Sequence, residues 1–119
     1  MTRFASLTAG VLLAALLAGC GKDAPEKSDA ELGLNAQQAA GRQVYRLACA
    51  RCHNAYSSAP LDGRSLQGLF RKKYLPSGLP ANDRFVGQTI QQGRGMMPAF
   101  GGSLTSQQFD DLLAYLHTL

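Results

Sequence analysis

The sequence has no tryptophan, and phenylalanine and tyrosine together make up only 8% of its 119 residues. It also has no run of Lys and Arg interleaved with aromatic residues, and its formal net charge is a mild +4. These absences argue against a nucleic-acid-binding surface, which needs a concentrated basic patch. The length allows one small domain. A core of roughly 80 residues is near the size that benefits from a staple such as a metal, a disulfide or a cofactor.

The sequence also lacks an apolar run long enough for a permanent membrane-spanning helix. Behind Arg3, residues 4–18 form an apolar stretch of about 15 residues, whereas a spanning helix needs roughly 20. A positive residue followed by a short apolar stretch is typical of an export signal. We therefore predict that residues 1–19 are a cleaved signal peptide.

The end of this segment, Leu17-Ala18-Gly19-Cys20, resembles the lipobox of bacterial lipoproteins. In that family the chain is cut before the cysteine, which then receives acyl chains that anchor it firmly in a membrane. The resemblance implies lipidation of Cys20, and Gly21 after it favours the outer membrane over the inner one. An ordinary signal peptide with a chance cysteine is the alternative.

Residues 20–34 are rich in charge and poor in apolar side chains. Such a composition predicts a flexible tether, and the folded domain is expected over residues 35–119. Within it we predict four helices and no strand, hence an all-α fold. The helices are expected over residues 36–48 after an Asn35 cap, over residues 65–72, from a cap at Ala81-Asn82-Asp83 to about Gln92, and from a Thr105–Gln108 capping box to the C-terminus. Gly41 lies within the first helix, where it marks either a close helix crossing or a tolerated surface position.

The residues Cys49-Ala50-Arg51-Cys52-His53 form a C-x-x-C-H motif, which is the attachment sequence of a c-type haem. Two thiols one helical turn apart can add to the two vinyl groups on one porphyrin edge, and the following imidazole can bind the iron. A redox disulfide would instead sit at a strand-to-helix junction. A zinc site lacks ligands, since His117 is the only other histidine and Cys20 is assigned to lipidation. The motif therefore predicts one covalent haem c with His53 as an iron ligand.

The sixth ligand is expected in the glycine-rich stretch from Gly93 to Gly102, which contains two adjacent methionines. A thioether is soft and neutral, and it favours ferrous iron. Met97 is the better candidate because Pro98 rigidifies the backbone beyond it. Met96 is the competitor, and a five-coordinate iron with both methionines in packing roles is the third option.

Over residues 35–119 the chain resembles the class I (monohaem) cytochromes c of the bacterial periplasm. The family's Ile-x-x-Gly matches Ile90 to Gly93, and its Met-Pro-x-Phe matches Met97 to Phe100. The resemblance implies about four helices wrapped around the haem, with crossing terminal helices. Gly41 and Tyr45 would then meet residues of the last helix, namely Leu112, Tyr115 and Leu116.

The resemblance also implies roles around the haem. Pro60 matches the family's proline whose carbonyl accepts the proximal histidine's ring N–H, an interaction that orients the ring and raises its basicity. Phe100, Leu66 and Leu69 are expected to pack against the haem.

Two bound axial ligands leave no coordination site for a substrate, so we expect a periplasmic single-electron carrier rather than an enzyme. Redox partner proteins would dock transiently at the haem edge. The rim charges expected there are Lys72, Lys73, Arg51 and Arg94. The alternatives are a permanent cytochrome subunit of a larger dehydrogenase or oxidase, and a haem enzyme or gas sensor with a labile sixth ligand. No small-molecule substrate and no nucleic acid are expected as partners.

Overall fold

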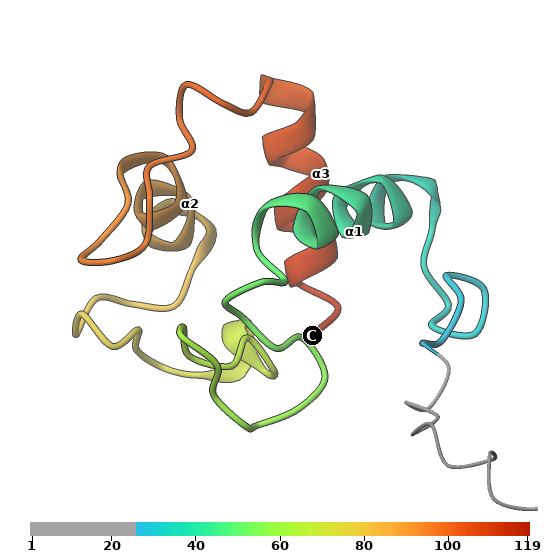
Figure 1. Cartoon of the computed structure of the whole chain (residues 1–119), viewed down its shortest axis with the longest axis horizontal. Helices are drawn as coiled ribbons and strands as arrows, with labels where there is room; N and C mark the ends of the chain where they lie inside the picture. Colours follow the sequence, from blue (N-terminus) through green and yellow to red (C-terminus); the bar gives the residue numbers. More distant parts are fainter. Residues whose placement is uncertain (1–25) are drawn as a thin grey trace, which may run out of the picture.

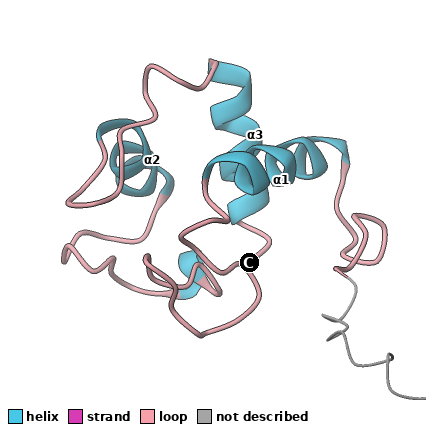
Figure 2. Ribbon diagram, viewed as in Figure 1, coloured by secondary structure: helices cyan, strands magenta, loops and turns pink. Residues whose placement is uncertain are grey.

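The computed structural model describes residues 26–119, so the predicted signal peptide and Cys20 lie outside the described residues. The helices in this part are α1 (Ala36–Ala48), the 3₁₀ turn η1 (Leu69–Arg71), α2 (Asp83–Gln92) and α3 (Ser106–Leu116) (Figure 1). Residues 26–119 contain no strand, only two isolated bridges (Figure 2). The predicted all-α fold is confirmed. None of the helices described is long and apolar enough to cross a bilayer.

The three α-helices begin at the capping residues that their sequences predict. Asn35 accepts from the backbone N–H of Gln38, whose side chain bonds back to Asn35, and Thr105 and Gln108 form the same capping box for α3. Helix α2 begins at Asp83 after an Asn82 cap, within the predicted cap segment from Ala81 to Asp83. Each cap stabilises its helix by about 1 kcal/mol.

The short helix predicted over residues 65–72 is reduced to the single turn η1. Gly68 adopts a left-handed conformation (φ 66°), which stops a helix from running through this position. The Ser65 hydroxyl also bonds the backbone N–H of Gln67, a local turn that competes with helix formation. Leu69 is nevertheless buried, as expected of the apolar side of this segment.

Helices α1 and α3 cross closely, as the resemblance implied (Figure 1). A Cβ added at Gly41 would overlap the backbone carbonyl oxygen of Asp111 and lie 2.9 Å from the Cβ of Tyr115. The tilted rings of Tyr45 and Tyr115 pack beside this point, with centroids 5.4 Å apart. Gly41 is therefore a contact position and not a tolerated surface glycine.

The C-terminal residues attach η1 and α2 to α3. The Leu119 carbonyl accepts from the N–H of Gly68 at 2.9 Å. The His117 ring stacks on Phe70 with centroids 3.8 Å apart, and its Nε2 lies 2.6 Å from a carboxylate oxygen of Asp83. The last residues of the chain thus link the end of α3 to η1 and to the start of α2.

Residues 26–34 differ from the flexible tether predicted over residues 20–34. They fold into turns against α1, where Glu26, Lys27 and Asp29 all bind the guanidinium of Arg42. Their charge is therefore used in contacts with the domain, which a composition-based prediction does not reveal.

Candidate haem site

The C-x-x-C-H motif continues from the last turn of α1. Cys49 is the residue that caps the helix, and its N–H bonds the Tyr45 carbonyl at 2.8 Å. The Cys49 carbonyl then accepts from the N–H groups of Cys52 and His53 at 3.0 and 2.9 Å. One more turn thus brings both thiols and the imidazole to one end of α1. Both cysteines are free and half-buried.

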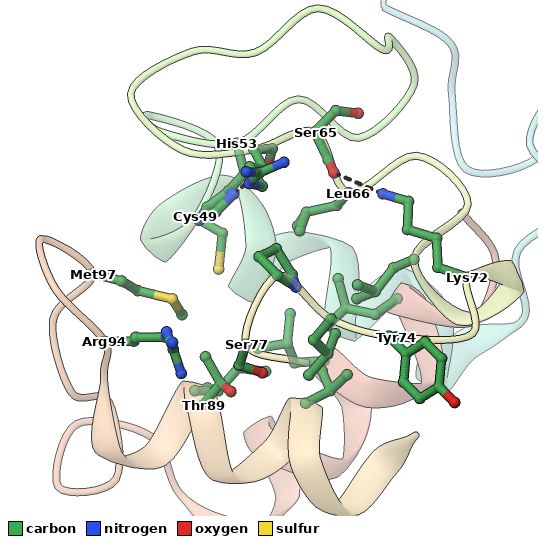
Figure 3. Close-up of a pocket in the computed structure, with 18 residues that line it drawn as sticks. Cys49, His53, Ser65, Leu66, Lys72, Tyr74, Ser77, Thr89, Arg94 and Met97 are labelled. Atoms are coloured by element: carbon green, nitrogen blue, oxygen red, sulfur yellow. Dashed lines mark hydrogen bonds between the residues drawn. The ribbon is translucent and has the colours of Figure 1, made fainter. Parts of the chain in front are cut away.

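A cavity of about 490 Å³ opens beside this turn, within the range of small-ligand and cofactor pockets. Figure 3 shows the Cys49 sulfur pointing into it. The predicted packing residues Leu66 and Leu69 both line it. The other aliphatic side chains of the wall come from the 74–77 loop, α2 and α3, and they include Leu75, Val86, Ile90, Leu112 and Leu116.

Phe100 is not among the residues that line this cavity, so its packing against the haem stays a prediction. Its N–H bonds the carbonyl of Ile90 at 2.9 Å, which folds the chain back over the end of α2. The ring then lies with Leu104 and Phe109 around a separate hollow. The Phe100 backbone thus fastens the loop to the end of α2.

The ring of His53 is held by the carbonyl of Arg64, 2.7 Å from Nδ1. Because a carbonyl only accepts, Nδ1 carries the proton, and Nε2 keeps its lone pair for a metal. The prediction that Pro60 provides this carbonyl is wrong. The chain turns back at Gly63, whose N–H bonds the Cys52 carbonyl at 2.7 Å. The carbonyl that reaches the ring is therefore that of Arg64, four residues after Pro60.

Gly63 is a site residue that the sequence did not single out. A Cβ at this position would lie 2.5 Å from Cε1 of His53 and 2.8 Å from Nδ1. Only a glycine lets the backbone pass so close to the imidazole. Its only signal in the sequence is the Asp62-Gly63 pair, which is typical of a turn.

The two adjacent methionines point in different directions. Met97 lines the cavity, whereas Met96 is 88% exposed. The backbones of Arg94 and Met97 exchange two hydrogen bonds of 3.0 Å, which closes the loop. Gly93 starts it with a φ of 72°, and a Cβ there would lie 2.6 Å from the Met97 carbonyl oxygen. This tight turn places the Met97 side chain inward and the Met96 side chain outward.

The charges at the cavity are of one sign. Arg64, Lys72 and Arg94 are among the residues that line it, and no Asp or Glu is. Such a rim favours an apolar ligand with acidic groups at one edge. Burial, and then the neighbouring Cys52, raise the pKa of Cys49 to about 11, so this group is a neutral thiol at pH 7.

Three tyrosines connect the motif to the surface. The Tyr45 hydroxyl donates to the backbone carbonyl of His53, its ring packs on Tyr115, and the Tyr115 hydroxyl lies 2.8 Å from that of Tyr56. Burial raises the pKa of both Tyr45 and Tyr115. The resemblance implied the meeting of Tyr45 and Tyr115 at the helix crossing, but no sequence pattern indicated Tyr56 as their partner.

These residues fit a covalently attached haem. Two thiols lie one turn apart, an imidazole offers Nε2, a thioether reaches the same apolar cavity, and cations surround it. In an all-helical domain with crossing terminal helices, this arrangement defines a c-type cytochrome of class I. The chain belongs to the family described as cytochrome c oxidase, cbb3-type, subunit III, whose model matches residues 36–116.

Similar proteins include several cytochromes c6. The chain is 33% identical to cytochrome c6 of Picosynechococcus sp. over 84 residues, covering 68% of this chain and 72% of the relative. It is 31% identical to cytochrome c6 of Thermosynechococcus vestitus over 83 residues, covering 70% of each. The protein therefore carries one haem c bound through Cys49 and Cys52, and it is a single-electron carrier rather than an enzyme.

Proposed function

We propose that the carrier works on the periplasmic side of a membrane with His53 and Met97 as the two axial ligands of its haem iron. The observation that supports this ligand pair is the opposite placement of the two methionines. Met97 shares the cavity with His53, while Met96 is exposed to solvent. A bound haem supplies an iron that gains or loses one electron, and a thioether ligand raises its reduction potential.

The surrounding residues hold these two ligands in place. The Arg64 carbonyl orients the His53 ring and increases its basicity. The paired backbone bonds between Arg94 and Met97 keep the thioether on a closed loop. With both ligands bound, the iron has no free position for a substrate, in agreement with electron transfer as the function.

Replacing Met97 tests the ligand assignment. Oxidised haem with a methionine ligand shows a weak far-red sulfur-to-iron absorption band. We expect Met97→Ala to abolish this band in the purified holoprotein and Met96→Ala, the matched control, to leave it unchanged. Loss of the band in the Met96 variant alone would overturn the assignment.

Docking at the haem edge is the second part of the proposal. The cavity rim carries Lys72 and Arg94, and Lys73 and Arg51 are exposed nearby in sequence. A negatively charged partner face would be steered to this rim, and the association rate would depend on ionic strength. We expect Lys72→Gln to slow electron exchange with an anionic redox partner at low salt and to have little effect at high salt. An unchanged rate at low salt would exclude Lys72 from docking.

Attachment to a membrane through acylated Cys20 is the third part, and the outer membrane is favoured over the inner one. The support is the sequence Leu17-Ala18-Gly19-Cys20 after an apolar segment. Mass spectrometry of the mature N-terminus in its native host should find an acylated cysteine, and Cys20→Ser should release the protein from membranes. A mature chain that begins at another residue would contradict this part.

A permanent place in an oxidase is a second candidate function. The family model is described as a subunit of a cbb3-type cytochrome c oxidase, and this description favours such a role. Mild detergent extraction separates the two candidates. A carrier should purify alone, whereas a fixed subunit should co-purify with its partner in a constant ratio.

A further inference from the structure

Arg42 carries the most deeply buried charge among the residues that the structure describes. Its side chain is only 1% exposed, although it lies on α1 near the surface segment formed by residues 26–34. We call this segment the strap. All the acceptors found for its guanidinium belong to the strap: Asp29 Oδ1 at 2.5 Å, Glu26 Oε1 at 2.9 Å and the Lys27 carbonyl at 2.6 Å.

These contacts make the strap part of the domain. A buried guanidinium is costly unless its donors are paired, and here the strap provides two carboxylates and one carbonyl. Arg46 adds a second ion pair with Glu26 at 3.1 Å. The buried Nε of Arg42 has no partner, so the charge depends on the strap contacts for its compensation.

The strap is also bonded within itself. The Ser28 hydroxyl and N–H both bond Glu31, and the N–H groups of Leu32 and Leu34 bond the carbonyls of Ser28 and Asp29. The chain then enters the Asn35 cap of α1 directly. The strap therefore has a defined path from Glu26 to the helix and does not act as a free linker.

This path shortens the connection to Cys20. Fifteen steps separate Cys20 from Asn35, and a free chain of that length would reach about 50 Å. With the strap bound, only the six steps from Cys20 to Glu26 remain, which span at most about 20 Å. Cys49 lies seven residues beyond Arg42 on α1, a rise of about 10 Å. The haem attachment turn is thus connected to the anchoring residue through six extended steps, the Glu26–Arg42 ion pair and about two turns of α1. This path is shorter than fifteen free steps followed by the whole of α1.

We propose that the strap holds the cytochrome domain against the bilayer and so selects a membrane-embedded redox protein, whose docking face lies near the membrane surface, as its partner. This inference rests on the proposed lipidation of Cys20. A partner whose docking face lies far from the bilayer would be out of reach while the strap is bound.

Energy transfer measures this distance in the lipidated holoprotein. Vesicles of phosphatidylcholine would carry a headgroup fluorophore whose emission overlaps haem absorption, so quenching reports the height of the haem. We expect strong quenching by the wild type. The double variant Glu26→Gln, Asp29→Asn should quench at least about twofold less, because its uncompensated Arg42 favours the open strap. Glu31→Gln is the matched control, since Glu31 bonds only Ser28 within the strap.

Two further measurements keep the test independent of folding defects. Ten flexible residues inserted between residues 25 and 26 should reduce quenching as strongly as the double variant while leaving the strap intact. Trypsin cuts after Lys27, whose carbonyl is bound by Arg42, so cleavage there should be slow in the wild type and about tenfold faster in the double variant.

The outcomes separate the two proposals. A holoprotein that does not float with the vesicles refutes the lipid anchor and, with it, the role of the strap. A holoprotein that floats but shows equal quenching in the wild type and the insertion variant leaves the anchor standing and refutes the short connection. Cleavage after Lys27 that is equally fast in the wild type and the double variant refutes the bound strap itself.

Discussion

The hydroxyl groups of Tyr56 and Tyr115 lie 2.8 Å apart, and only one of these residues reaches solvent. Tyr56 is 46% exposed, while Tyr115 is completely buried at the crossing of α1 and α3. If this hydrogen bond is lost, the two hydroxyl groups therefore differ in whether they can find another partner. Tyr56 can bind water, whereas Tyr115 cannot.

This difference predicts an asymmetric response to removing either hydroxyl. Tyr115→Phe should lower the free energy of unfolding by about 1 kcal/mol, because only the hydrogen bond itself is lost. Tyr56→Phe should cost more, about 1–3 kcal/mol, because it leaves a buried hydroxyl without a partner. Denaturant unfolding of the holoproteins measures both. If the exposed tyrosine were the cheaper one to replace, the hydrogen bond would not matter for stability.

The same tyrosines predict a loss of stability at alkaline pH. Burial raises the pKa of Tyr115, helped by the bond to Tyr56, and burial also raises the pKa of Tyr45. Above about pH 10 the unfolded chain releases these protons while the native state keeps them. The unfolded state then binds fewer protons, so stability falls with rising pH, by about 1.4 kcal/mol per pH unit for each tyrosine.

Unfolding between pH 9 and pH 11 checks this prediction. The stabilising contribution of the two tyrosines to the free energy of unfolding is fully present below about pH 10. The control is Tyr115→Phe. Without the Tyr115 hydroxyl, the free energy of unfolding should fall less steeply with pH, by the contribution of one tyrosine. The titration of the lysines should be unchanged. Identical slopes in the wild type and this variant would contradict it.

Gly41 and Gly87 predict different costs for the same substitution. Alanine inside a helix is normally favoured over glycine by about 1 kcal/mol. At Gly41 the new Cβ would overlap backbone of α3, which cannot move aside alone, so we expect a net loss of about 1–3 kcal/mol or more. At Gly87 the Cβ would meet the tip of the Phe109 ring at 2.8 Å, which can shift. In thermal unfolding, the midpoint temperature of Gly41→Ala should be well below that of Gly87→Ala.

Gly63→Ala should displace the His53 ring and lengthen its bond to the Arg64 carbonyl. A weaker bond makes the imidazole a weaker donor to iron, so the reduction potential of the holoprotein should rise. Gly102→Ala is the control, because a Cβ there meets no atom within 4 Å. Voltammetry of the two variants gives the result, and equal potentials would show that Gly63 does not position the ring.

The parts that the sequence predicted well depend on local patterns. Asn35 and Thr105 could be recognised because each capping box lies within four residues, and the spacing from Cys49 to His53 is fixed by one helical turn. The inward placement of Met97 followed from a similarly local cue, the proline beside it.

The parts that it missed depend on the paths of loops and on distant contacts. No local pattern decides whether the carbonyl of Pro60 or that of Arg64 meets His53, because the loop between them turns back only at Gly63. Residues 26–34 have the composition of a solvated segment, and their partner Arg42 lies 13–16 residues away. Only the folded chain brings these groups together.

The crossing of Gly41 with Asp111 also has a consequence for how the molecule folds. The contact joins positions about 70 residues apart, so the chain must close a large loop before α1 and α3 can pack, and such non-local contacts slow folding. The residues that line the cavity lie inside this loop, apart from Leu112 and Leu116, which follow it in α3. We therefore expect a chain without the last residues, from Leu116 to Leu119, to lose the whole cavity. The packing of α3 on α1 holds together the two ends of the chain segment that forms the cavity walls.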